Sequence, residues 1–280
     1  MNKDQIIQQV MKELLAQQES TSKDTTPAPS ATATPAATAE SCSRSGGARC
    51  GVTEFVGNGP YGDSLGLVIA NLDASLHKIL GIPEQYRAIG VVTARSGAGP
   101  EIMAADEAVK SCNAEVVFFE QSNDTKGGGG HGSILMFGAE DVSDARRAVE
   151  VCLQALEWSY GGIVSNGTSY VECQYTARAS YALEKYMHAE LGKAWGLVNG
   201  CPAGIGVLMA DTALKAADVK LVAYGSSNTG ANEADTNEFI TMFIGDSAAV
   251  KQAVQAGRDV GIQLLRTLGD EPKPTGTEYF

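Results

Sequence analysis

Two glycine-rich segments are the places where backbone atoms of this sequence could hold a phosphate. In residues 125–132, Lys126 stands ahead of four consecutive glycines. A phosphate-binding loop has the reverse order, with the lysine after the glycines and at the start of a helix, so phosphate binding is disfavoured. In residues 96–100 the glycine spacing opens like a dinucleotide-binding motif, but Ile102 stands where the third glycine is required.

Consecutive glycines leave backbone amides and carbonyls uncovered, which fits either a narrow polar passage or a flexible connection. A second loop, residues 226–237, is also polar and has no large apolar side chain, which favours the passage. The candidates for lining such a passage are Asp124, Lys126, Gly127, Gly128, Gly129, Gly130, His131, Ser226, Ser227, Asn228 and Asn232.

Signals for catalysis or metal binding are weak. The three histidines lack the spacing of a metal pair, and no CxxC, HExxH or GxSxG motif occurs. Of the six cysteines only Cys42 and Cys50 are close in sequence, and a tetrahedral metal would need further ligands from another chain. We therefore expect no catalytic residue, no metal and no cofactor, and reduced, mostly buried thiols.

Composition excludes several classes of partner. The 280 residues carry a formal net charge of -12, which opposes binding to nucleic acid or to an anionic membrane. No apolar run approaches the roughly 18 residues of a membrane span, and the N-terminus does not read as a secretion signal. We expect a folded protein in the cytoplasm.

The N-terminal 51 residues differ from the remainder. Residues 1–18 have the apolar spacing of a short amphipathic helix, whose apolar stripe includes Ile6, Ile7, Val10 and Leu14. Residues 19–51, rich in Thr, Ala, Ser, Pro and Gly, are expected to be a disordered linker. A short isolated helix is marginally stable in water, so it is expected to dock on another protein or to pack back on its own chain.

The remaining sequence repeats itself. Residues 102–117 match residues 207–222 at an offset of 105, with five of sixteen positions identical and most of the others exchanging one apolar residue for another. Apolar periodicity predicts the same order of elements in both copies. The first repeat, residues 52–160, is expected to hold strands at 65–70, 89–93, 115–120 and 134–137 and helices at 75–80, 102–111 and 143–158. The second repeat, residues 161–280, is expected to hold strands at 171–176, 195–199, 220–224 and 239–244 and helices at 181–187, 207–216 and 248–268.

Each repeat is therefore predicted to be a small α/β sandwich, and two such units in one chain favour closed cyclic assembly. In both repeats a lysine follows an aspartate by four residues, as Lys110 follows Asp106 and Lys215 follows Asp211. This spacing forms a helical ion pair. Lys110 with Asn113, and Lys215 with Asp218, also present a polar edge at the end of the helix that could meet a copy of itself. The sequence leaves both interpretations open.

The repeated motifs ADEAVKSCNAEVV and ADTALKAADVKLV, together with TARSGAGPEIMAADEAVK, DTKGGGGHGS and QYTARASYALEK, resemble the bacterial microcompartment shell domain. Their order resembles the circularly permuted tandem members of that family, over residues 52–280. The resemblance implies an α/β fold with two permuted shell domains per chain and a homotrimer that imitates a hexamer. It also implies edge-to-edge tiling with other shell proteins and pores for a small polar metabolite such as a diol or glycerol.

The resemblance further implies roles for particular residues. Tile-edge positions would be Lys110, Asn113, Lys215 and Asp218, with Arg178 beside them, and the N-terminal helix would bind encapsulated enzymes. The resemblance implies a structural protein of the compartment shell without catalytic activity. An oligomeric sensor or enzyme with its site in the glycine-rich loop is the alternative from another class.

Overall fold

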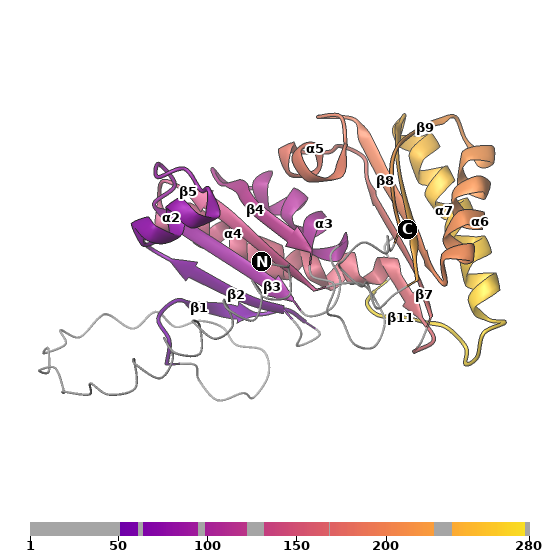
Figure 1. Ribbon diagram of the computed structural model, residues 1–280, viewed down its shortest axis with the longest axis horizontal. Helices are drawn as coiled ribbons and strands as arrows, with labels where there is room; N and C mark the ends of the chain where they lie inside the picture. Colours follow the sequence, from indigo (N-terminus) through magenta and orange to yellow (C-terminus); the bar gives the residue numbers. More distant parts are fainter. Residues whose placement is uncertain are drawn as a thin grey trace, which may run out of the picture. The chain divides into compact units, whose positions relative to one another are not determined.

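The structure is a computed structural model that describes residues 51–60, 64–94, 99–121, 132–167, 169–226 and 237–277 (Figure 1). The expected N-terminal helix with Ile6, Ile7, Val10 and Leu14, the linker up to residue 50 and both N-terminal cysteines lie outside these ranges.

The first repeat forms a five-stranded antiparallel sheet with strand order β1-β2-β3-β5-β4. Helices α3 and α4 pack on each other, and α4 also packs against β1, β2, β3 and β5. The strands are β1 (Phe55–Asn58), β2 (Ser64–Ile69), β3 (Ala88–Ala94), β4 (Glu115–Gln121) and β5 (Ser133–Ala139). The helices are α2 (Ala74–Leu80), α3 (Gly99–Val109) and α4 (Val142–Ser159).

The second repeat follows after a short 3-10 turn, Tyr160–Gly162, and forms a six-stranded antiparallel sheet with strand order β11-β6-β7-β8-β10-β9. Helices α6 and α7 pack together on it, as Figure 1 shows. The strands are β6 (Ile163–Ser165), β7 (Tyr170–Thr176), β8 (Ala194–Cys201), β9 (Val219–Ser226), β10 (Phe239–Gly245) and β11 (Lys273–Pro274). The helices are α5 (Tyr181–Met187), α6 (Ala203–Ala216) and α7 (Ser247–Leu265).

The expected α/β class and the duplicated order of elements are confirmed. Helices α3 and α6 each begin three or four residues earlier than predicted, at Gly99 and Ala203. The first turn of each helix contains glycine. Glycine has a low helix propensity, so the sequence pattern predicted a later start, although the observed helices accommodate the glycine. Strands β1, β6 and β11 were not predicted, because segments of two to four residues are too short to show periodicity.

The two faces of β7 differ in chemistry. Val171 and Cys173 belong to the apolar core shared with α6 and α7. Side chains alternate across a strand, so Tyr170, Glu172 and Gln174 share the opposite face. All three are buried, although two of them are polar. A strand of this repeat therefore carries buried polar groups on the face away from its own helices.

Helices α2 and α5 are equivalent at an offset of 107, and they begin and end in the same way. Asp73 caps the start of α2 by accepting a bond from the Ser75 backbone N–H, and Ser180 does the same for Ala182 at the start of α5. Both helices end in a left-handed residue, Gly81 at φ 67° and His188 at φ 56°. Among the described residues His188 is the only non-glycine with positive φ.

Candidate functional site

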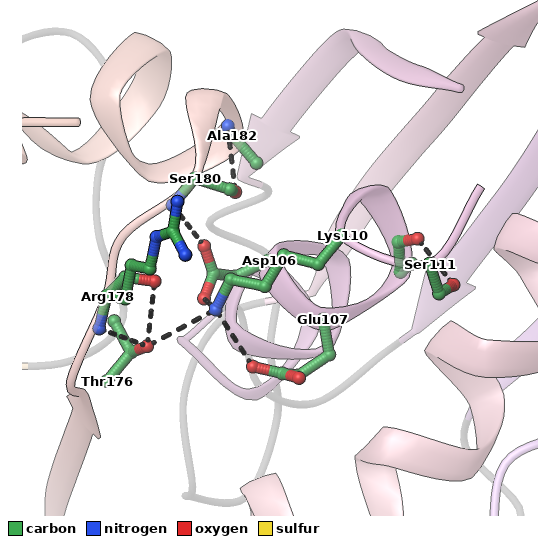
Figure 2. Close-up of polar contacts among 9 residues, drawn as sticks. Asp106, Glu107, Lys110, Ser111, Thr176, Arg178, Ser180 and Ala182 are labelled. Carbon is green, nitrogen blue, oxygen red and sulfur yellow. Dashed lines mark hydrogen bonds and ion pairs between the residues drawn. The ribbon is translucent and has the colours of Figure 1, made fainter. Parts of the chain in front are cut away.

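The predicted pair Asp106–Lys110 lies where the first repeat meets the second (Figure 2). The Lys110 Nζ donates to Asp106 Oδ2 at 2.6 Å, and the Ser180 backbone N–H donates to Asp106 Oδ1 at 2.7 Å. The Lys110 Nζ also donates hydrogen bonds to Glu107 Oε1 at 3.0 Å and to the Thr176 hydroxyl at 3.5 Å. The Asp106 side chain is fully buried, so its carboxylate joins the two repeats.

The equivalent pair in the second repeat has no such surroundings. Lys215 Nζ lies 2.6 Å from Asp211 Oδ2, but the two side chains are 74% and 50% exposed. An exposed pair of this kind contributes about 0.3 to 0.5 kcal/mol. One sequence motif therefore yields a buried junction in the first repeat and a surface pair in the second.

The other predicted tile-edge residues also lie at the surface. Asn113 and Asp218 are exposed, and each follows the end of its helix, α3 or α6. Arg178 is exposed. Its backbone N–H donates to the Thr176 hydroxyl and its backbone carbonyl accepts from that hydroxyl, both at 3.3 Å. The same hydroxyl also accepts a hydrogen bond from Lys110. The structure thus brings Lys110 and Arg178 together but leaves Lys215 apart.

Among the predicted passage residues only Ser226 is described. Its hydroxyl donates to the backbone carbonyl of Glu238 at 3.2 Å, which ties the end of β9 to the start of β10. The remaining candidates lie outside the described residues: Asp124, Lys126, Gly127, Gly128, Gly129, Gly130, His131, Ser227, Asn228 and Asn232.

A cavity of about 370 Å³ lies against the polar face of β7. We name it the acidic cavity because it contains two glutamates. Its walls come from α3 and β4 of the first repeat and from five elements of the second, and they include Gly99, Phe119, Glu172, Tyr186, Met187, His188, Leu197, Asn199, Ala223, Tyr224, Gly225, Glu238, Ile240 and Met242.

Neutral donors hold both carboxylates in place. The Tyr170 hydroxyl donates to Glu238, and Asn199 Nδ2 donates to the same carboxylate at 2.9 Å. Burial, together with the charge of Glu238, raises the pKa of Tyr170, so this phenol remains a donor. Gln174 Nε2 donates to Glu172 Oε1 at 3.1 Å.

The side chain of Glu172 also lies against the start of α3. A Cβ built on Gly99 would lie 1.7 Å from Glu172 Oε1, so the carboxylate fills the space that glycine leaves open. A negative group is stabilised at a helix N-terminus by the helix dipole. This contact joins a strand of the second repeat to a helix of the first.

The acidic cavity was not predicted from the sequence. Glu172, Asn199 and Glu238 are far apart in the sequence, and a polar residue in a strand ordinarily indicates a solvent-facing position. One feature of the sequence could have indicated the cavity: Tyr170, Glu172 and Gln174 share one face of a strand whose other face is apolar. Polar residues on a strand face that must be buried indicate a site.

Within the described ranges, no group of three or more His, Cys, Asp or Glu side chains is placed to hold a metal ion. None of the helices described there combines the length and apolarity needed to cross a bilayer.

Comparison with known proteins identifies the family. The BMC domain matches residues 88–168 and again 194–269. The chain belongs to the BMC domain family. The two matches follow one another along the chain, which confirms the tandem arrangement of two BMC domains.

The bacterial microcompartment shell protein PduB of Salmonella typhimurium is 52% identical over 231 residues, covering 82% of this chain and 84% of that protein. PduB of Limosilactobacillus reuteri is 44% identical, covering 79% and 92%. These BMC proteins are named as shell proteins, in agreement with a structural and non-enzymatic role.

Solved structures of BMC proteins share the fold. A crystal structure of a trimeric bacterial microcompartment shell protein PduB matches with a TM-score of 0.77 and 43% identity, covering 82% of this chain and all of that one. EtuB from Clostridium kluyveri matches with a TM-score of 0.77 and 48% identity, covering 82% and 99%. The chain is therefore a tandem BMC shell protein of the PduB and EtuB type.

Proposed function

We propose that this chain is a trimeric tile of a microcompartment shell, in which three chains supply six repeats to one ring. The observation that carries the proposal is an unequal burial of equivalent surfaces. Ile102 and Met103 on α3 are fully buried, whereas their equivalents on α6, Val207 and Leu208, are 50% and 40% exposed. Within one chain, the second repeat covers α3. In a ring, the first repeat of a neighbouring subunit would cover α6 in the same way.

The equivalence of the two repeats indicates which residues would make contact at this proposed interface. Within the chain, the Phe119 ring meets the Tyr186 ring edge to face at 5.5 Å between centroids. The equivalent of Phe119 is Tyr224, which is 72% exposed, and the equivalent of Tyr186 is Ile79, which is 79% exposed. We expect Ile79 of one subunit to pack against Tyr224 of the next.

Charge substitution tests this interface. Ile79→Lys and Tyr224→Lys should each convert trimers to monomers, measured by native mass spectrometry or light scattering, because a buried charge opposes apolar packing. Tyr181→Lys is the matched control. Tyr181 is 68% exposed on α5 even though α5 already packs against the first repeat, so it lies outside the proposed contact. Trimers that survive both substitutions would contradict the proposed interface.

The tile edge is a further part of the proposal. Lys110, Asn113, Lys215, Asp218 and Arg178 are exposed and polar, as contacts between rings require. Lys215→Asp is the informative substitution, because Lys110 also neutralises the buried Asp106 and its replacement would perturb the fold. We expect intact trimers that no longer form sheets in electron micrographs. Unchanged sheets would exclude Lys215 from the edge.

We also propose that small polar metabolites such as a diol or glycerol pass through the tile. The acidic cavity supports this proposal, because its volume exceeds that of such a molecule and its walls supply hydrogen-bonding groups. A ligand-binding sensor or enzyme is the alternative. It would bind a small molecule with isolated rings that never tile, so sheet formation distinguishes the two functions.

The N-terminal helix is proposed to attach encapsulated enzymes to the shell. Its apolar stripe at Ile6, Ile7, Val10 and Leu14 supports the proposal, as does the Pro-rich linker that follows. Deletion of residues 1–40 should leave shells that form without their enzyme core. Shells that fail to form would instead give this segment a role in tiling.

A further inference from the structure

A second cavity, of about 360 Å³, lies between α7 and the segment that carries β11. We name it the tail cavity, and we call residues 271–277 the tail. The wall combines apolar groups with two arginines and one exposed aspartate, and it includes Arg258, Asp259, Ile262, Arg266, Pro272 and Pro274. It shares no lining residue with the acidic cavity.

Arg258 marks a difference between the closing helices of the two repeats. Its equivalent on α4, at an offset of 105, is Leu153, which is 9% exposed and lies beside Gly57 of β1. In the first repeat this position belongs to the apolar core. Arg258 is half-buried, and a guanidinium at such a position favours an anionic partner that the first repeat does not require.

Contacts along β6 show how this strand runs relative to α7. Asn166 Nδ2 donates to the Leu265 carbonyl at 3.2 Å, at the end of the helix. A Cβ on Gly261 would lie 2.8 Å from Val171, which pairs with Val164 of β6. Passing backward along β6 from Asn166 therefore means passing backward along α7 toward its first residues.

The tail follows this direction toward Arg258. β11 is antiparallel to β6, so the chain runs back along α7 and continues that way after Thr277, the last described residue. Pro274 and Ile262 both line the cavity. Two residues of a strand advance about 6.6 Å and four residues of a helix about 6 Å, so Gly276 comes level with Arg258. Glycine has no side chain, which leaves room there for the guanidinium.

We propose that the segment following the described tail closes the tail cavity, with the Glu278 carboxylate bound to the Arg258 guanidinium. Side chains alternate across a strand, so Glu278 shares the face of Pro274 that lines the cavity. Helix side chains lean toward the N-terminus of the helix, which directs Arg258 toward Glu278. The other arginine of the cavity shows the same chemistry, since Arg266 Nε donates to Glu271 of the tail at 2.9 Å.

This ion pair would hold an edge-protecting strand in place. The Thr275 N–H donates to the Ile163 carbonyl of β6 at 2.9 Å, so the N–H groups of the residues before and after it point away from the sheet. Pro272 and Pro274 stand at outward-pointing positions and have no N–H, which opposes pairing with a further strand. Release of the tail would instead uncover the edge of β6.

Amide hydrogen exchange on the assembled full chain tests the closure, because the Thr275 N–H reports whether the tail is on the sheet. Glu278→Gln should raise the exchange rate of this amide about threefold to fivefold, the effect of losing one ion pair. Glu278 lies beyond the last described strand, so its replacement leaves the core intact. Asp270→Asn is the matched control, since Asp270 is exposed, precedes the tail and does not line the cavity. This control should keep the parent rate, and an unchanged rate in Glu278→Gln would overturn the proposal.

Charge exchange tests the pairing and its occupant. Arg258→Glu and Glu278→Arg should each raise the rate more than Glu278→Gln does, and both changes in one chain should restore the parent rate. Fast exchange that persists in this double variant overturns the pairing. When the two single variants are mixed in one assembly, exchange should stay fast, because each tail binds its own chain. Recovery on mixing overturns closure within the chain and assigns the cavity to the tail of a second copy.

Discussion

The two repeats share one fold and one helix motif, yet that motif has different surroundings in each. In the first repeat Asp106 is buried and binds both Lys110 and the Ser180 backbone. In the second repeat Asp211 binds Lys215 at the surface. The role of a repeated residue therefore depends on which surface covers it, and only the first copy is covered by its own chain.

The sheets differ in a complementary way. The equivalent of Glu172 on β7 is Leu65 on β2, and the equivalent of Glu238 is Gly132. At these two positions a carboxylate is therefore present only in the second repeat, on the face that meets the first repeat of the same chain. The repeats thus have two similar faces, and the buried glutamates Glu172 and Glu238 belong to only one of them.

The largest expected difference between the repeats concerns the two aspartates. Asp106→Ala leaves the Ser180 N–H and the Lys110 ammonium without their buried acceptor, and should lower the free energy of unfolding by about 3 kcal/mol. Asp211→Ala should lower it by no more than about 0.5 kcal/mol, because that pair is exposed. Urea unfolding at one fixed protein concentration measures both. Equal losses would show that the buried junction contributes nothing beyond a surface pair.

The next effect concerns glycines at the starts of α3 and α6. A methyl group on Gly99 would collide with Glu172, and Gly99→Ala should cost about 2 kcal/mol of stability. Gly204 is its equivalent, and a Cβ there meets nothing within 4 Å. Gly204→Ala should therefore stabilise the chain by up to about 0.5 kcal/mol in thermal unfolding of the monomer, because alanine favours the helix.

The same alanine also probes the proposed ring. If a neighbouring subunit covers α6, then Gly204→Ala should weaken trimers while it stabilises the monomer. Sedimentation over a range of concentrations measures this association. Trimers of unchanged affinity would place the start of α6 outside the interface.

The sequence predicted the fold well but the site only in part. The repeat at an offset of 105 and its apolar periodicity located the main helices and strands, and α5 was predicted at its observed limits. The pair Asp106–Lys110 was recognised, but its burial was not, because burial depends on Thr176 and Ser180 of the other repeat. Glu172 and Glu238 were missed for a similar reason, since the sequence separates groups that β-pairing brings together.

A smaller difference is expected at the left-handed ends of α2 and α5. Left-handed backbone is unfavourable for residues with a Cβ, so His188→Gly should raise the free energy of unfolding by about 1 kcal/mol. Gly81→Ala should lower it by a similar amount, because a Cβ there meets the same strain. Chemical denaturation of both variants makes the comparison. A loss of stability in His188→Gly would show that the imidazole makes a stabilising contact.

The smallest expected difference is a pH effect at the helix starts. Hydrogen bonds from the Ser75 hydroxyl and backbone N–H lower the pKa of Asp73, the cap of α2. A lowered pKa in the folded state gives stability that is present above the ordinary value of 3.8 and is lost as the pH falls through the folded value. Ser180, the cap of α5, has no charge to lose in this range.

Amide hydrogen exchange at pH 6 and pH 3, corrected for intrinsic rates, resolves this effect. Protection in the first turn of α2 should fall on acidification, whereas protection in the first turn of α5 should not. Asp73→Ser should make α2 behave like α5, because a hydroxyl cap does not titrate in this range. A parallel loss in both helices would mean that acid weakens the chain as a whole, and that the two caps do not distinguish the repeats.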